Sequence, residues 1–161
     1  MTNHTISIEL LYDHPHLIAA VGTLRWKEWG HPPEPIERAW WIDSTQREAG
    51  RDQLPVTWVA IDQGGAAVGA VGLAPHDDVV ERHHQSPWLV GMIVAPTKRN
   101  RGIGGRLVAA LEAWAKQQGY PQVWVATGGR AVMFYHKCGW RVAEQIARPS
   151  EEDIVVLTTV L

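Results

Sequence analysis

A continuously apolar segment, a glycine-rich basic loop and a segment with helical spacing follow one another near the middle of the chain. Residues 87–95, PWLVGMIVA, have the composition of a strand that is buried on both faces. From Gly102 onward apolar residues recur at helical intervals, and Gly119 followed by Pro121 is typical of the end of a helix. A strand joined to a helix in this way favours a sheet whose faces are covered by helices.

The remaining sequence adds further strands and helices on both sides of this segment. The residue patterns predict strands at 5–13, 55–62, 66–75, 122–126, 141–147 and 153–161, and helices at 17–30, 35–49 and 130–138. The tripeptide QGG before the third of these strands is a hairpin signal. We therefore expect one domain over residues 1–161, with a mixed α/β sheet of about six to seven strands flanked by about four helices.

Composition and charge limit the environment and the partners of this domain. Hydrophobic residues make up 45% of the 161 positions, enough for a complete core, and the single cysteine, Cys138, excludes an internal disulfide. The first ten residues lack a leader pattern and the longest apolar stretch is far shorter than a membrane span, so we expect a cytoplasmic protein without a membrane partner. A net charge of -2 argues against nucleic acid as a partner.

The loop KRNRGIGGRL, residues 98–107, combines glycines and cations where a helix begins. The first N–H groups of a helix are unpaired and attract anions, and glycines at 102, 104 and 105 leave these groups accessible. A dinucleotide fingerprint would need a glycine where Leu107 stands, and the lysine and hydroxyl of a P-loop are missing. A pyrophosphate bound by backbone amides remains, beside the alternative of a simple glycine turn with solvated cations. The cations are Lys98, Arg99, Arg101 and Arg106.

Two segments resemble the sequence motifs of one enzyme family. Residues 94–115, VAPTKRNRGIGGRLVAALEAWA, resemble the acyl-coenzyme A binding motif of the GNAT family of N-acetyltransferases. The core of that motif is Arg or Gln, two residues, Gly, one residue, and Gly or Ala, and it is filled here by Arg99, Gly102 and Gly104. Residues 131–140, AVMFYHKCGW, resemble the second motif of the family through Phe134, Tyr135, Lys137, Gly139 and Trp140.

The resemblance, which covers about residues 56–141, implies a fold and a cosubstrate. It implies a sheet with a splayed central pair of strands, and acetyl-CoA as the cosubstrate without a metal ion. A bulge is expected at Gly91, because glycine inside a strand often marks one. Met92 and Val94 would then offer backbone groups to the pantetheine arm, with the Met92 N–H stabilising the oxyanion. Arg99 would also bind the cofactor. The pyrophosphate of acetyl-CoA would lie on the amides of Arg101, Gly102, Ile103, Gly104 and Gly105.

The resemblance also assigns a proton donor and leaves one contact open. Tyr135 would protonate the departing thiolate, since a tyrosine with its ordinary pKa of about 10 keeps its proton at neutral pH. The alternative is a tyrosine that is packed only for its ring. The family often has an asparagine seven residues before this tyrosine, where this chain has Gly128, so the pantetheine contacts of that loop stay open.

The acidic loop HDDVVERHHQS, residues 76–86, supplies candidates for the acceptor site. Asp77, Asp78 and Glu81 could hold a cationic amine, although a solvated polar loop would have the same composition. Either Glu81 or His83 could accept the proton of the amine, because only a neutral amine attacks a thioester. The short histidine pairs lack a third ligand at a recognisable spacing, so no metal site is expected.

Two functions of different classes follow from these observations. The first is an enzyme that transfers acetyl from acetyl-CoA directly to a primary amine, with a small cationic molecule as substrate or, as a competing acceptor, a protein N-terminus or lysine. The second is a non-catalytic module that binds or senses acyl-CoA. Tyr135 and the acidic loop favour the enzyme. A homodimer is one assembly that we consider for it.

Overall fold

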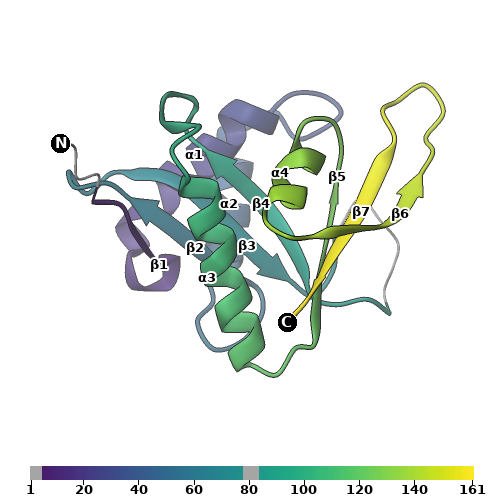
Figure 1. The fold of residues 1–161 in the computed structure, drawn as a ribbon. Coiled ribbons are helices and arrows are strands. Elements are labelled where there is room, and N and C mark those ends of the chain that lie inside the picture. The colour runs from purple at the N-terminus through teal and green to yellow at the C-terminus, as the bar shows by residue number, and fades with distance from the viewer. Residues whose placement is uncertain (1–4, 78–83) are drawn as a thin grey trace. The chain divides into compact units, whose positions relative to one another are not determined.

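The computed structural model describes residues 5–77 and 84–161, and these contain four α-helices and seven β-strands (Figure 1). The helices are α1 (Ile18–Trp29), α2 (Arg38–Arg47), α3 (Ile103–Gln117) and α4 (Ala131–Lys137). The strands are β1 (Ser7–Leu10), β2 (Val56–Ile61), β3 (Ala67–Ala74), β4 (Trp88–Val94), β5 (Gln122–Thr127), β6 (Arg141–Ile146) and β7 (Ile154–Val160). The predicted α/β class and the order of elements are confirmed.

The strands form a mixed sheet in the order β1-β2-β3-β4-β5-β7-β6. The pairs β1–β2, β2–β3, β5–β7 and β6–β7 are antiparallel. Strands β4 and β5 are parallel, and their register is recorded at two positions, Trp88↔Trp124 and Leu89↔Val125. Such a sheet, with its parallel pair joined through α3, is the mixed arrangement that the sequence predicts.

Two predicted elements are shorter in the structure than in the sequence analysis. The first strand stops at Leu10, because the chain enters a 3₁₀ turn at Leu11, whose side chain is fully buried. Helix α2 begins at Arg38 rather than at Pro35. Indole N–H groups bind the carbonyl oxygens of the preceding residues, from Trp41 to Pro35 at 2.8 Å and from Trp26 to Ile36 at 3.0 Å, so this segment is held outside the helix.

Backbone contacts divide the chain into two compact units, called unit 1 and unit 2 below. Unit 1 comprises residues 1–73 and 91–111, and unit 2 comprises residues 74–90 and 112–161. Both β4 and α3 begin in one unit and end in the other. The single domain over residues 1–161 stays a prediction.

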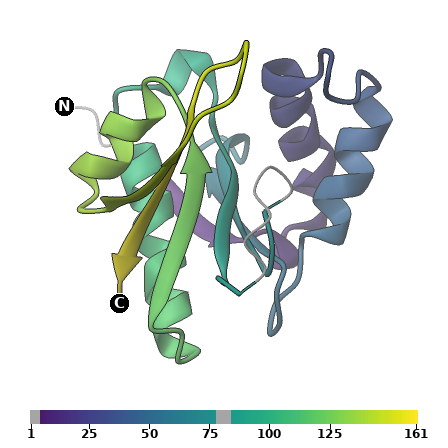
Figure 2. The ribbon, with the colours of Figure 1, turned by 90° about the vertical axis from the view of Figure 1, so that its right-hand side faces the viewer.

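Unit 1 buries β2 and β3 on both faces. Helices α1 and α2 lie side by side (Figures 1 and 2), and a Cβ on Gly22 would be 2.7 Å from the Ile42 Cα. Ala70 of β3 belongs to the cluster on the α1 face. Its neighbour Gly69 lies on the other face of β3, where a Cβ would be 3.3 Å from Leu107 of α3. Successive residues of a strand point to opposite faces, which explains the continuously apolar sequences. The cluster on the α1 face consists of Leu11, Leu17, Val21, Val59, Ile61, Ala70 and Ile93.

Unit 2 is built from β5, β7 and β6, with α4 against β7. Strands β5 and β7 run side by side over the whole length of β5 (Figure 2). Trp88 at the start of β4 packs with Ile154 and Val156 of β7. Trp140, after α4, is buried and donates a hydrogen bond from Nε1 to the Glu112 carboxylate at 3.1 Å. These contacts hold α4 in a defined position within unit 2.

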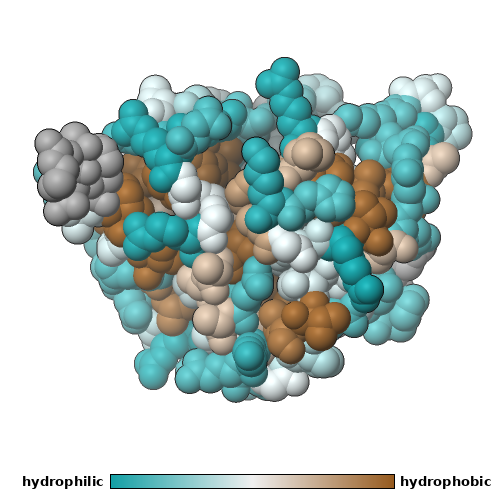
Figure 3. All heavy atoms as spheres, viewed as in Figure 1, coloured by the Kyte–Doolittle hydropathy of each residue, from teal (hydrophilic) through white to brown (hydrophobic). Residues whose placement is uncertain are grey.

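The surface is mixed in hydropathy on the face that Figure 3 shows, where hydrophobic residues gather in several separate groups between hydrophilic ones. Among the described residues, none of the helices has the length and apolar character that crossing a membrane requires. The large hydrophobic side chains that are exposed come from different elements: Tyr12, Ile36, Trp40, Met133, Val142 and Val160.

Candidate functional site

The loop before α3 presents a row of backbone amides in unit 1. The N–H of Arg106 donates to the Gly102 oxygen at 3.2 Å, so the amides of Ile103, Gly104 and Gly105 precede this turn of the helical ladder. Gly102 has φ +80°, a conformation that suits glycine, and a Cβ at Gly102 or Gly105 would meet no atom within 4 Å. Open space therefore lies beside Gly102 and Gly105, at both ends of this row of amides, which is where an anion could approach it.

The cations of this loop differ in their surroundings. Arg101 and Arg106 are exposed next to the amide row. Arg99 instead donates from Nε to the carbonyl oxygen of Val94 at 3.0 Å and from Nη2 to the Glu28 carboxylate at 3.1 Å. Two residues that the resemblance assigns to the cofactor, Arg99 and Val94, are thus bonded to each other. This pair ties the loop to the end of β4 and to α1.

The backbone conformation of β4 is irregular at Gly91, where the sequence predicts a bulge. Gly91 has φ +60° in the interior of the strand, which is the glycine conformation of a G1 bulge. Met92 follows it, is half-buried and belongs to unit 1 with the glycine loop. The structure therefore places the predicted oxyanion donor directly after the irregular residue of the strand.

A buried arginine in α1, which the sequence analysis missed, contacts Gly91. Arg25 is 3% exposed and donates from Nε to the Gly91 carbonyl oxygen at 3.2 Å. Its Nη1 donates to Thr45 Oγ1 at 3.2 Å and to Glu48 Oε1 at 3.1 Å. Burial lowers the pKa of Arg25 from its usual value while Glu48 opposes that change, and a guanidinium stays charged in proteins.

A signal for this arginine was present in the sequence. Leu17, Val21 and Arg25 follow one another at intervals of four, so an arginine occupies the stripe of α1 that faces the core. A charged residue on a buried stripe requires a partner. The partners Gly91 and Glu48 are distant in the sequence, so only the tertiary structure identifies them.

Tyr135 lies in α4, in unit 2, and is 3% exposed. Its ring packs against Phe134 at a centroid distance of 5.0 Å and against Trp140 at 5.5 Å. Burial raises the pKa of Tyr135 well above its ordinary value, and Cys138 adds to the increase. The hydroxyl therefore keeps its proton throughout the neutral range. Burial also raises the pKa of the Cys138 thiol, as does Glu112, which makes Cys138 a poor nucleophile.

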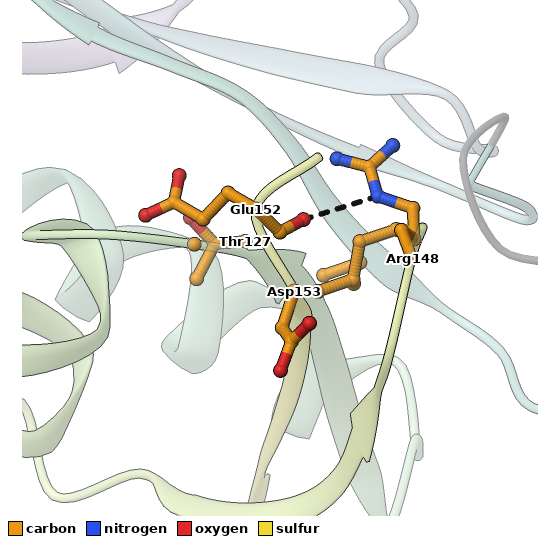
Figure 4. Close-up of a pocket in the computed structure, with 7 residues that line it drawn as sticks. Thr127, Arg148, Glu152 and Asp153 are labelled. Atoms are coloured by element: carbon orange, nitrogen blue, oxygen red, sulfur yellow. Dashed lines mark hydrogen bonds between the residues drawn. The ribbon is translucent and has the colours of Figure 1, made fainter. Parts of the chain in front are cut away.

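A hollow of about 190 Å³ lies at Gly128 in unit 2 (Figure 4). A Cβ on Gly128 would be 3.2 Å from the Asp153 carbonyl oxygen, which explains the small residue there. Arg148 donates from Nε to the Glu152 carbonyl oxygen at 3.2 Å, and the carboxylates of Glu152 and Asp153 point in different directions. The lining residues are Ala126, Thr127, Gly128, Arg148, Glu152, Asp153 and Ile154.

The acidic loop at 76–86 is described only at its two ends. Asp78, Glu81 and His83 lie outside the described residues. Asp77 is half-buried and has an interaction partner, whereas the His84 side chain is exposed. Within residues 5–77 and 84–161, no three His, Cys, Asp or Glu side chains are grouped as a metal ion would require.

Comparisons with known proteins agree with the fold and with the family that the sequence resembles. The model of the "Acetyltransferase (GNAT) family" matches residues 18–140. A solved aminoglycoside 6'-N-acetyltransferase complexed with coenzyme A superposes with a TM-score of 0.77, at 16% identity over 96% of each chain. The spermidine/spermine N-acetyltransferase SpeG from Vibrio cholerae has a TM-score of 0.68, at 15% identity over 96% of this chain and 92% of that one. At such identities these likenesses establish the fold. No match was found among curated protein sequences.

Proposed function

Because this chain belongs to the GNAT family of acetyl-CoA-dependent acetyltransferases, we propose that it transfers acetyl directly to a primary amine of a small cationic molecule. The observation that supports this most directly is the row of amides from Ile103 to Gly105, which has open space beside Gly102 and Gly105 and exposed cations next to it. The names of the aminoglycoside and spermidine/spermine acetyltransferases with similar structures, which refer to cationic amines, support the acceptor class.

The loop residues fit the diphosphate of acetyl-CoA. The amides of Ile103, Gly104 and Gly105 would donate to its oxygens, and Arg101 and Arg106 would neutralise its charge. Bound acetyl-CoA supplies an activated acetyl thioester. The N–H of Met92 would donate to the acetyl carbonyl oxygen as negative charge develops there.

Tyr135 and the acidic loop supply the proton transfers in this proposal. Tyr135 keeps its proton at neutral pH and would donate it to the departing sulfur. Asp77 and the loop that follows it would attract a cationic acceptor, and Glu81 would remove the proton of the amine. An alkyl ammonium has a pKa of about 10, so this deprotonation is required near pH 7.

A screen for thiol release tests the proposed function. The full chain is incubated with acetyl-CoA and with separate sets of polyamines, aminoglycosides, simple alkylamines and peptides, and free thiol is measured over time. We expect release with small cationic amines that clearly exceeds the rate without acceptor. Release with peptides alone would contradict a small acceptor, and tight acetyl-CoA binding without release from any amine would contradict transfer.

The amide row can be tested by adding one charge at Gly105. Gly105→Glu is expected to weaken acetyl-CoA binding about tenfold, about 1.4 kcal/mol, because the carboxylate repels the diphosphate. The side chain enters open space, so the fold should be unaffected. Calorimetric titration measures the affinity, and Gly105→Gln is the matched neutral control. Equal affinities of the two variants for acetyl-CoA would contradict a charge effect at this position.

The acceptor site can be tested by neutralising the acidic loop. The double variant Asp78→Asn with Glu81→Gln is expected to raise the KM of the acceptor about tenfold, as removal of a charge contact near a cation implies. The affinity for acetyl-CoA should stay within about twofold. Glu152→Gln, in the hollow at Gly128, is the comparison variant. An increase in acceptor KM with Glu152→Gln alone would place the acceptor at that hollow instead.

A further inference from the structure

One peptide group of β4 is held from the side by Arg25. The guanidinium donates to the Gly91 carbonyl oxygen at 3.2 Å, and a Cβ on Gly91 would be only 2.7 Å from Arg25 Nη2. The guanidinium therefore lies directly against the backbone of Gly91, in space that is available only because residue 91 is glycine. All of these atoms belong to unit 1.

The same peptide group contains the N–H of Met92. Among the described residues the cis peptide bonds all precede proline, so the Gly91–Met92 bond is trans. In a trans peptide the C=O and the following N–H point in opposite directions within one rigid plane. A donor that binds the Gly91 oxygen therefore also determines the direction of the Met92 N–H, which points away from the guanidinium.

We propose that Arg25 is a positioning residue, which aims the N–H of Met92 at the acetyl carbonyl oxygen by holding the carbonyl of Gly91. This inference rests on the proposed function, in which Met92 N–H stabilises the developing oxyanion. Gly91 has a wide range of backbone conformations, so an unanchored peptide at this position could rotate. Donors to an oxyanion are effective only when they are oriented before the reaction.

The charge of Arg25 adds a second effect on the same N–H. A cationic donor on the Gly91 oxygen polarises the amide, and hydrogen bonds that share a polar group strengthen one another in a low-dielectric interior. The Met92 N–H thus becomes a better donor. Thr45 and Glu48 bind Nη1, so they hold the guanidinium while Nε is directed to Gly91.

Stability alone does not explain a buried arginine here. Its Nη2 has no hydrogen-bond partner among the described residues, although it is buried. The free-energy cost of removing an ion pair from water offsets most of the electrostatic attraction between its two charges. A guanidinium with an unbonded N–H group recovers even less of that cost. Val21, one turn earlier on the same stripe of α1, shows that an apolar side chain fits this face of the helix. A role in orienting β4 accounts for the arginine where packing does not.

Arg25→Lys is the test variant, because it retains the charge beside Glu48 but lacks the planar fork that reaches several acceptors at once. We expect kcat to fall about tenfold while the KM for acetyl-CoA stays within about twofold, as loss of an interaction made in the transition state implies. In NMR spectra of the unliganded protein, the Met92 amide proton should shift to higher field, because its peptide is less polarised. Val21→Ala is the control, which lowers thermal stability without touching Gly91 and should leave both readouts unchanged.

The wild-type protein and a second variant keep the inference testable if Arg25→Lys does not fold. A through-hydrogen-bond coupling between Arg25 Nε and the Gly91 carbonyl carbon should be detectable in the wild type. Glu48→Gln, at a partly exposed side chain, should shift the Met92 amide proton in the same direction by a smaller amount. Absence of the coupling, an unchanged Met92 resonance, or a kcat loss matched by Val21→Ala would overturn the inference. Absence of acetyl transfer by the wild type would instead contradict the proposed function, while the coupling and the resonance would still report whether Arg25 holds the peptide.

Discussion

Replacing Tyr135 with phenylalanine is expected to lower kcat about 100-fold and to leave acetyl-CoA affinity within about twofold. The substitution keeps the ring that packs against Phe134 and Trp140, so the structure of α4 should be preserved. It removes the proton that the departing sulfur would receive. Steady-state kinetics with the best acceptor of the screen, together with calorimetric titration of acetyl-CoA, measure the two quantities.

Tyr120→Phe is the matched control, since it removes a tyrosine hydroxyl elsewhere in unit 2 and should leave kcat unchanged. The pH profile supplies an independent check. The pKa of Tyr135 is raised, so its proton is retained to higher pH than that of an ordinary tyrosine. The wild-type rate should therefore rise with pH as the amine loses its proton, without a falling limb below about pH 10. A kcat of Tyr135→Phe within about threefold of wild type would assign the proton to water or another group.

Replacing Gly91 with alanine is expected to reduce the free energy of unfolding by about 2–5 kcal/mol. A φ of +60° costs a residue with a Cβ about 1–2 kcal/mol, and overpacking against a buried group costs about 1–3 kcal/mol more. The added methyl group would meet Arg25 at 2.7 Å, where the guanidinium is held by its own partners. Chemical denaturation monitored by tryptophan fluorescence measures the change.

Gly65→Ala separates the two causes of this effect. Gly65 also has a positive φ, +85°, but a Cβ there would meet nothing within 4 Å, so only the conformational strain applies. We expect a loss of about 1–2 kcal/mol for this control. Combining Gly91→Ala with Arg25→Lys should cost less than the sum of the single changes, because the shorter cation can move away. Equal losses for Gly91→Ala and Gly65→Ala would show that the close approach of Arg25 adds nothing to the cost of a Cβ at Gly91.

Local patterns in the sequence were sufficient to predict most elements of the fold. The helix predicted from Gly102 to Gly119 is Ile103–Gln117, and the apolar strand predicted at 87–95 is Trp88–Val94. Periodicity and stop signals depend on residues that are near one another in the sequence, so they predict helices and strands without any knowledge of the tertiary contacts. The start of α2 was predicted three residues early. The carbonyls of Pro35 and Ile36 are bound by the indoles of Trp41 and Trp26, and the residue pattern does not show these hydrogen bonds.

The candidate site also has features that could be predicted from nearby residues and features that depend on tertiary contacts. The glycine turn and the start of α3 were predicted correctly, because they depend on consecutive residues, and the binding of a diphosphate there stays a prediction. The partners of Arg99 and the hollow at Gly128 were not predicted, since Glu28 and Glu152 approach them only after folding. Asp77 marks the start of the acidic loop in the structure, and the roles of Asp78 and Glu81 stay predictions.

By itself, the sequence determined the family, the order of the elements and the position of the glycine-rich loop before α3, because each depends on residues that are close together in the chain. Only the tertiary structure decided how the strand beside that loop is held. Arg25 is separated from Gly91 by 66 positions, and its hydrogen bond to that carbonyl exists because α1 packs over β4 within unit 1. A buried donor takes its partner from whatever the packing of helices and strands brings within about 3 Å, and no spacing along the chain encodes that distance.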